Sequence, residues 1–127
     1  MSPIAHVGAT RPAQGAVLTK AVVRAADRLK VSSKVVARTL GLSEPTVSRM
    51  RRGSFTLDPT SKPFELGVLL VRLFRSLDAI VGGDESAAAA WLANTNTVLD
   101  GRPIDKIQKV DGLTDVIAYL DARRARV

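Results

Sequence analysis

The sequence predicts an all-α protein, built as an N-terminal helical bundle followed by a second small helical domain. Apolar residues recur at spacings of three and four along most of the 127-residue chain, which is the period of a helix. Glycine, proline and serine interrupt that period where helices are expected to begin and end. Hydrophobic residues make up 46% of the chain, enough for a packed core, and the absence of cysteine excludes disulfides and thiolate metal sites.

Positive charge is concentrated in the first part of the chain. Residues 1–60 hold ten Lys and Arg against three Asp and Glu, which accounts for the whole net charge of +7. Residues 61–127 hold nine of each kind. A basic excess in one part favours a nucleic-acid partner for that part, and the neutral second part is expected to have a different partner.

The beginning of the chain, residues 1–16, is expected to form a flexible tail because prolines and glycines occur there without a helical period. The single histidine, His6, has no neighbouring ligands or base partner, so no role is expected for it.

The first helix is expected from Val17 to Leu29, where apolar residues line one face.

Residues 33–52 have the pattern of two short helices joined by a tight turn. Gly41 suits positive φ at the end of the first helix, Ser43 is a good N-cap, and Pro45 falls in the first turn of the second helix. The apolar residues fall where the two helices must face each other and the core: Val36, Leu40, Leu42, Val47 and Met50.

This is the helix-turn-helix arrangement, in which the second helix enters the major groove of DNA. A purely structural hairpin is the alternative, since it could share the apolar spacing. The outer face favours DNA binding because its polar and basic side chains can hydrogen-bond phosphates and base edges. The predicted DNA-binding residues are Ser33, Lys34, Ser43, Thr46, Ser48, Arg49 and Arg52.

A long helix is expected to follow the connector 54–60, starting at Thr60 or Ser61 and ending near Val81. It carries two apolar stripes, one of Leu66, Leu70, Leu73, Leu77 and Ile80 and the other of Phe64, Val68 and Val71. Either both stripes bury within one subunit, or one stripe pairs two subunits. The second possibility predicts a homodimer, which suits a protein that reads two DNA half-sites.

The domains are accordingly placed at 17–58 for the helix-turn-helix domain and 59–127 for the second domain. After Gly82-Gly83, a further helix is expected to begin at Asp84 and to lead into Trp91. The remaining elements expected are an irregular loop at 94–100, a short helix at 104–109 opened by Pro103, a last helix over 113–120 after Asp111-Gly112, and a basic end.

The order Trp91-Leu92, an Asn-containing loop through Leu99, Gly101, Pro103-Ile104, Gly112, Val116 and Leu120 resembles the toxin-binding domain of the Xre/MbcA/ParS family of antitoxins. With the preceding helix-turn-helix, the resemblance covers about residues 20–125. It implies an antitoxin whose partner is a RES-domain toxin, an enzyme that degrades NAD or uses it to ADP-ribosylate a target. In that family the antitoxin occludes the NAD pocket of the toxin and binds its own promoter.

The same resemblance implies toxin contacts in the segment 91–103 and on the last helix. Family members commonly carry a longer end that approaches the toxin's active site. In this sequence the guanidinium groups of the basic end and the Val127 carboxylate have suitable chemistry for that role. The predicted toxin-binding residues are Trp91, Asn94, Asn96, Leu99, Arg102, Pro103, Tyr119, Arg123, Arg124, Arg126 and Val127.

An enzymatic role is not expected, because the chain has no cysteine, no histidine outside the tail, no phosphate-binding glycine loop and no cluster of metal ligands. Accordingly, no catalytic residue, cofactor or metal is predicted. A cytoplasmic location without membrane insertion is expected, since there is no signal-peptide pattern and charges interrupt the most apolar region. The alternative function is a free-standing helix-turn-helix transcriptional regulator whose second half dimerises or senses a small molecule.

Overall fold

The computed structural model describes residues 11–125, which form seven α-helices and no β-strand, as the sequence predicts. An isolated bridge pairs Asn96 with Gly101. None of the helices in this part of the chain is long and apolar enough to span a membrane. The helices are α2 (Arg11–Arg28), α3 (Ser33–Leu40), α4 (Glu44–Arg51), α5 (Lys62–Ile80), α6 (Glu85–Ala93), α7 (Pro103–Lys106) and α8 (Val110–Ala125).

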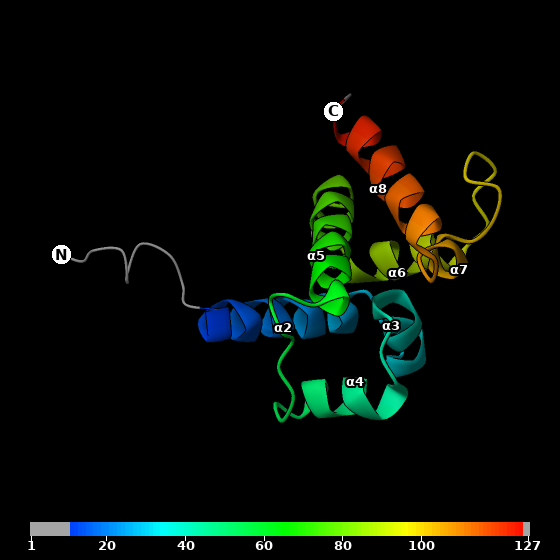
Figure 1. Cartoon of the computed structure of the whole chain (residues 1–127). Coiled ribbons are helices and arrows are strands. Elements are labelled where there is room, and N and C mark those ends of the chain that lie inside the picture. Colours follow the sequence, from blue (N-terminus) through cyan, green and yellow to red (C-terminus); the bar gives the residue numbers. More distant parts are fainter. Residues whose placement is uncertain (1–10, 126–127) are drawn as a thin grey trace.

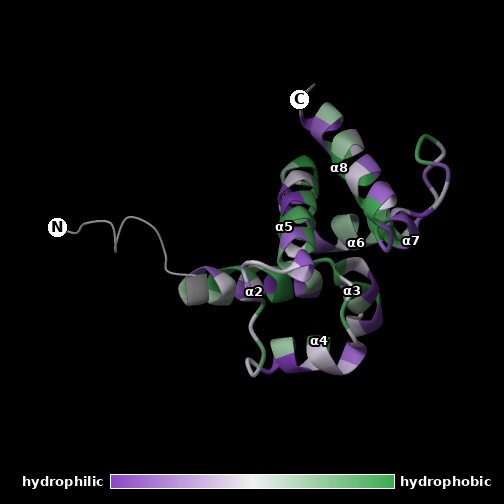
Figure 2. Ribbon diagram, viewed as in Figure 1, coloured by the Kyte–Doolittle hydropathy of each residue, from purple (hydrophilic) through white to green (hydrophobic). Residues whose placement is uncertain are grey.

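Helix α5 is the centre of the molecule. It packs against α2 near its beginning and against α8 along its length, and α3 also contacts it (Figure 1). Helix α3 lies at the C-terminal end of α2, and α4 lies on the side of α2 away from α5, farthest from α8 (Figure 1). Apolar residues concentrate where α5, α6 and α8 face one another, whereas polar residues dominate the outer side of α4 (Figure 2). One continuous core joins both halves.

Helix α2 begins at Arg11, earlier than the predicted start at Val17. Residues 11–16, expected to be part of the tail, are therefore helical; residues 1–10, including His6, lie outside the described part. Gly15 lies inside this helix, at the point where the connector crosses it. A glycine is required there because a Cβ would lie 2.3 Å from the carbonyl oxygen of Leu57. The expected tail is wrong at residues 11–16, because a glycine required for close approach has the same sequence signal as a glycine that breaks a helix.

The helix-turn-helix is confirmed, together with the predicted positions of Gly41 at the end of α3 and Ser43 at the start of α4. Ser32 is the N-cap of α3, its Oγ accepting a hydrogen bond from the backbone N–H of Val35 at 3.2 Å. Gly41 ends α3 with φ of 74°, a left-handed conformation that glycine adopts without a steric penalty. Ser43 caps α4 in the same way as Ser32 caps α3. These caps fix where the two helices start and stop.

The connector 54–60 lies on the core. Leu57 is 2% exposed, and its backbone N–H donates to Oγ1 of Thr19 at 2.9 Å. The Thr19 hydroxyl in turn donates to the carbonyl of Gly15 at 2.6 Å, so one buried side chain joins α2 to the connector. Ser61 then caps α5. This polar link satisfies backbone and hydroxyl groups that burial would otherwise leave unpaired.

Both apolar stripes of α5 pack within the chain to a large extent. The stripe of Leu66, Leu70, Leu73 and Leu77 is buried in the core. In the second stripe Val71 is buried and Phe64 is half-buried, which leaves Val68 exposed. Packing on α2 and α8 therefore uses most of the surface that could have paired two subunits, and the homodimer stays a prediction.

The end of the chain differs from the prediction in where its helices begin. Helix α7 covers only Pro103–Lys106, and α8 begins at Val110 instead of after Gly112. Gly112 lies inside α8, where a Cβ would be 2.1 Å from the carbonyl oxygen of Lys106. Gly112 is thus needed for the tight approach of α7 to α8 and not to end a helix.

Candidate functional site

Helix α4 presents a polar face to solvent while its apolar face is buried. Val47 and Met50 point into the core at 1% and 3% exposure. Because they lie three residues apart on one side, the predicted DNA-contacting side chains fall on the other side. Arg49 and Arg52 are exposed, and Thr46 and Ser48 are half-buried. No helix of the described part covers this face of α4 (Figure 1).

Hydrogen bonds within α4 hold some of these groups in place. The Ser43 Oγ accepts from the backbone N–H of Thr46 at 3.2 Å and lies 2.9 Å from the Thr46 hydroxyl. Arg49 Nη2 donates to Thr46 Oγ1 at 3.0 Å, which directs the guanidinium toward the start of the helix. Ser43 thus has a capping role in addition to its predicted contact. Lys34 is exposed on α3, and Ser33 is half-buried beside the Ser32 cap.

Arg51 has a role that the sequence did not indicate. Its guanidinium forms an ion pair with Asp27 of α2, and Nη2 donates to the backbone carbonyl of Val31 at 2.9 Å. Arg51 therefore ties the outermost helix to the end of α2 and the turn that follows. The available signal was its position four residues after Val47, which places the two side chains on neighbouring parts of one helix face and so turns Arg51 toward the core side of α4.

A second surface lies at the junction of α6 and α8. The rings of Trp91 and Tyr119 stack with centroids 6.0 Å apart and planes inclined by 21°. The Arg123 guanidinium lies 5.8 Å from the Tyr119 ring centroid, and its Nη1 is 3.4 Å from the Tyr119 hydroxyl. All three side chains are half-buried, so part of each remains open to a partner. The structure thus brings together three of the predicted toxin contacts.

The loop between α6 and α7 projects from the helices (Figure 1). The backbones of Asn96 and Gly101 exchange two hydrogen bonds, at 2.9 and 3.2 Å, and the Asn96 Oδ1 accepts from the N–H of Leu99 at 3.0 Å. Val98 at the tip is 74% exposed although it is a large apolar residue. The loop therefore presents an apolar side chain on a backbone fixed by its own hydrogen bonds, a feature the sequence prediction missed.

Of the four other predicted toxin contacts in the segment 94–103, two are buried and two are exposed. Leu99 and Pro103 are buried, so they support the loop from inside. Asn94 is exposed at the end of α6. Arg102 donates to Asp105 at 3.0 and 3.2 Å. The hydrogen bond from Arg102 lowers the pKa of Asp105, and the same bond raises the pKa of Arg102.

Arg124 lies apart from the Trp91–Tyr119 pair. Its Nη1 donates to the hydroxyl of Ser76 at 3.2 Å, and that hydroxyl donates to Asp121 at 2.9 Å. Arg72 forms an ion pair with the same carboxylate. Burial acts to raise the pKa of Asp121, but the hydrogen bonds from Ser76 and Arg72 and the nearby positive charges outweigh it, so the pKa is lowered. Arg126 and Val127 lie outside the described residues.

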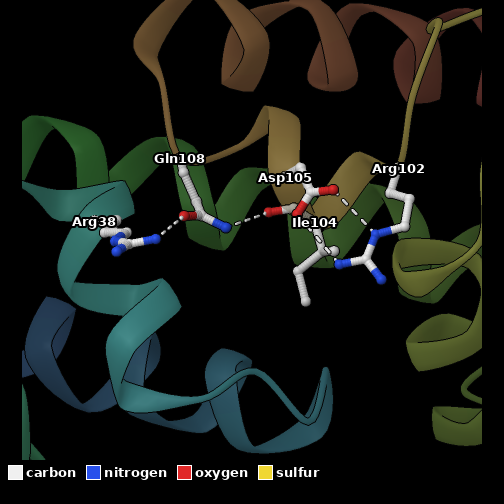
Figure 3. A network of polar contacts seen from close by, with 5 residues as sticks. All are labelled: Arg38, Arg102, Ile104, Asp105 and Gln108. Atoms are coloured by element: carbon white, nitrogen blue, oxygen red, sulfur yellow. Dashed lines mark hydrogen bonds and ion pairs between the residues drawn. The ribbon is translucent and has the colours of Figure 1, made fainter.

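A polar contact connects the helix-turn-helix to α7 and the turn that follows it. Arg38 of α3 donates from Nη1 to the Gln108 Oε1 at 3.5 Å, and the Gln108 amide donates to the carbonyl of Ile104 at 3.1 Å (Figure 3). Figure 3 shows Gln108 lying between α3 and the short helix α7.

Among the residues that the structure describes, no group of three or more acidic or histidine side chains is arranged to hold a metal.

Two family models match the chain. The antitoxin Xre-like helix-turn-helix domain matches residues 9–72, half of the chain, and the antitoxin Xre/MbcA/ParS C-terminal toxin-binding domain matches residues 76–126. Both the helix-turn-helix and the Trp91–Tyr119 surface thus lie within a matched domain. The transition between the matches falls inside α5, the helix that packs against both halves. No curated protein matches the sequence.

Proposed function

The chain belongs to the Xre-like antitoxins, and from this we propose that it neutralises a RES-domain toxin by blocking the toxin's active site and that it binds its own promoter. As an antitoxin of a toxin–antitoxin system, it has a toxin and DNA as its two partners. The observation that carries the proposal is the separation of two surfaces: the polar face of α4 in one matched domain, and the aromatic pair Trp91–Tyr119 in the other.

The proposed inhibition is steric and requires no catalytic step by the antitoxin. Trp91 and Tyr119 supply rigid aromatic area, which is typical of the residues that contribute most to protein interfaces. Val98 supplies a projecting apolar anchor, and its hydrogen-bonded loop loses little conformational entropy on binding. A toxin seated on these groups has its NAD pocket covered. Arg123, Arg126 and Val127 remain predicted contacts near that pocket.

For DNA, α4 is proposed to enter the major groove with Arg49 and Arg52 toward the bases. Ser33 and Lys34, at the start of α3, are proposed to contact the phosphate backbone, since both follow the Ser32 cap and Lys34 is exposed. The positive charge of residues 1–60 supplies the attraction that does not depend on sequence. A homodimer that reads two half-sites remains part of the proposal. A toxin bound at the Trp91–Tyr119 surface leaves α4 free to bind DNA.

The decisive test is co-expression of the chain with a RES-domain reading frame that neighbours its own. Growth, cellular NAD and size-exclusion elution are measured for the wild type, for Val98→Asp, and for Arg52→Ala as the matched control. The wild type and Arg52→Ala should restore growth and co-elute with the toxin, whereas Val98→Asp should fail in both. Absence of any complex with the wild type would refute the antitoxin–RES pairing and leave the free-standing regulator.

A further inference from the structure

A groove on the α2–α5 face of the molecule belongs to neither of the two proposed surfaces. Three adjoining hollows of about 570, 440 and 320 Å³ all border on Arg75 of α5. Two of them run between α2 and α5, and the third continues to the end of α8 at Arg124. We call the whole surface the α2–α5 groove. Its lining includes no residue of α3 or α4, and neither Trp91 nor Tyr119.

The floor of the α2–α5 groove is apolar and partly open to water. Val17 is 65% exposed and Val68 is 44% exposed, and both line the same hollow. Exposed large apolar side chains gathered in one concave place are typical of a protein-binding site. Ala21, Val71 and Phe74 complete the floor. Since the helices in the described residues 11–125 leave this floor uncovered, the groove can take further apolar side chains.

The rim of the groove is strongly basic. Six cations border it: Lys20, Arg24, Arg28, Arg72, Arg75 and Arg124. Two carboxylates offset part of this charge, Glu85 at 3.6 Å from Arg28 and Asp121 beside Arg72. The Arg28 guanidinium also lies 5.7 Å from the centre of the Phe74 ring, which holds it at the edge of the floor. The rim therefore keeps a net positive charge.

This combination of an apolar floor and a basic rim selects among possible occupants. A DNA backbone would use the cations but gain nothing from Val17 and Val68. A second copy of this face would bring like charges opposite one another, which costs free energy in a desolvated interface. We propose that the α2–α5 groove binds an acidic amphipathic helix of a partner protein, with apolar side chains on the floor and carboxylates facing Arg24 and Arg75.

The geometry of such a helix follows from the groove. Anchors at positions i, i+3, i+4 and i+7 form one stripe, which is the mode by which amphipathic helices enter apolar grooves. Carboxylates on both sides of that stripe then lie near the cations of α2 on one side and those of α5 and α8 on the other. Guanidinium groups can pair with carboxylates bidentately, so arginine suits this rim better than lysine.

The test uses the full chain and two synthetic peptides of about 18 residues, long enough to form a helix. Both carry Leu at the stripe positions; the polar positions are Glu in one peptide and Gln in the other. Affinity is measured by fluorescence anisotropy at about 0.15 M salt, and the binding site is mapped by amide chemical-shift changes. The proteins are the wild type, Arg24→Glu/Arg75→Glu, Val68→Ser, and Lys106→Glu/Lys109→Glu as the control outside the groove.

The Glu peptide is expected to bind the wild type and the Lys106→Glu/Lys109→Glu control equally, with shifts at α2 and α5. The groove variants, checked by circular dichroism for unchanged folding, should bind it about tenfold more weakly or not at all. The proposal is overturned if the wild type shows no affinity below about 1 mM, or if the Gln peptide binds as well as the Glu peptide.

Two further outcomes also overturn the proposal and identify another occupant. If Arg24→Glu/Arg75→Glu weakens binding to duplex DNA while peptide binding is unaffected, the groove is a nucleic-acid surface. If the wild type sediments as a dimer that Val68→Ser dissociates, the groove belongs to a second copy of the chain. Neither measurement depends on the toxin, so the α2–α5 groove and the antitoxin function are tested separately.

Discussion

The ring of Trp91 on α6 stacks on the ring of Tyr119 on α8, with 6.0 Å between the centroids. Since Leu92 and Leu120, the next residues on the two helices, are buried at 1% exposure, the stacked pair lies at the edge of the core. The aromatic surface therefore stays in place when no partner is bound. Such a preformed surface loses less conformational entropy on binding than a flexible one.

The first prediction concerns this pair. Trp91→Ala should weaken binding to the toxin by about 2 kcal/mol or more, the loss typical of a central aromatic contact. Tyr119→Phe keeps the ring and removes only the hydroxyl beside Arg123, so it should cost less. Titration calorimetry with purified toxin gives both values, and DNA binding serves as the control. Equal affinity for Trp91→Ala and the wild type would remove this surface from the toxin interface.

The second prediction concerns the exposed arginines of α4. Arg49→Ala or Arg52→Ala should weaken binding to promoter DNA, and a residue that pairs bidentately with guanine should lose about 1–3 kcal/mol of discrimination. A residue that contacts phosphate should instead weaken all sequences alike and reduce the salt dependence. Gel-shift titrations at several salt concentrations, with a scrambled duplex as control, distinguish the two. Unchanged binding by both variants contradicts the placement of α4 in the groove.

The third prediction separates Arg51 from its neighbour Arg52. Arg51→Ala should lower the free energy of unfolding by about 1–3 kcal/mol, because the Val31 carbonyl and Asp27 lose a charged donor. Arg52→Ala, at an exposed position, should change it by less than about 0.5 kcal/mol. Urea unfolding measures both. If the two variants are equally stable, Arg51 does not hold α4 to α2.

The fourth prediction concerns Gly112. A Cβ at this position would lie 2.1 Å from the Lys106 carbonyl oxygen, so Gly112→Ala forces α7 and α8 apart and should cost about 1–3 kcal/mol. The matched control is Gly67→Ala in α5, where the nearest atoms are side-chain methyl groups at 3.1 and 3.4 Å that can move. Thermal unfolding should show a clear drop in Tm for Gly112→Ala and a smaller change for the control.

The fifth prediction follows from the lowered pKa of Asp121. A carboxylate whose pKa is lower in the folded than in the unfolded protein stabilises the fold at pH values above the unfolded value of about 3.9. That stabilisation is lost as the pH falls through the folded value, because the unfolded state binds the proton first. Asp121→Asn should therefore reduce stability at about pH 6 and flatten its decline toward about pH 3. Urea midpoints across this range provide the measurement; parallel curves for both proteins would contradict it.

The sequence could predict the parts of the fold that depend on neighbouring residues. Ser43 and Gly41 were correctly placed as caps, since a cap acts on backbone groups within one helical turn. The course of α5 and the buried Leu66–Leu77 stripe also followed from spacing alone. Gly15 and Gly112 were misread, because their small size serves the approach of a distant segment.

In the candidate site, too, some features follow from neighbouring residues and others depend on segments distant in the sequence. The exposed face of α4 followed from the helical period, whereas the role of Arg51 depends on Asp27 and Val31, more than one helix away along the chain. Val98 has no periodic pattern around it, and its exposure results from the hydrogen bonds that shape the loop. Arg124 and Arg123 are adjacent in sequence yet face different partners, Ser76 and Tyr119.

By itself the sequence determined that the chain is helical, where most of its helices begin and end, and which side of α4 is polar. Period and capping act over three or four residues, so they can be read along the chain. Only the tertiary structure decided that α5 buries most of both stripes, that Trp91 meets Tyr119, and that α2 and α5 leave a basic groove between them. These features depend on helices approaching from distant positions, and the approach is set by packing of the whole core.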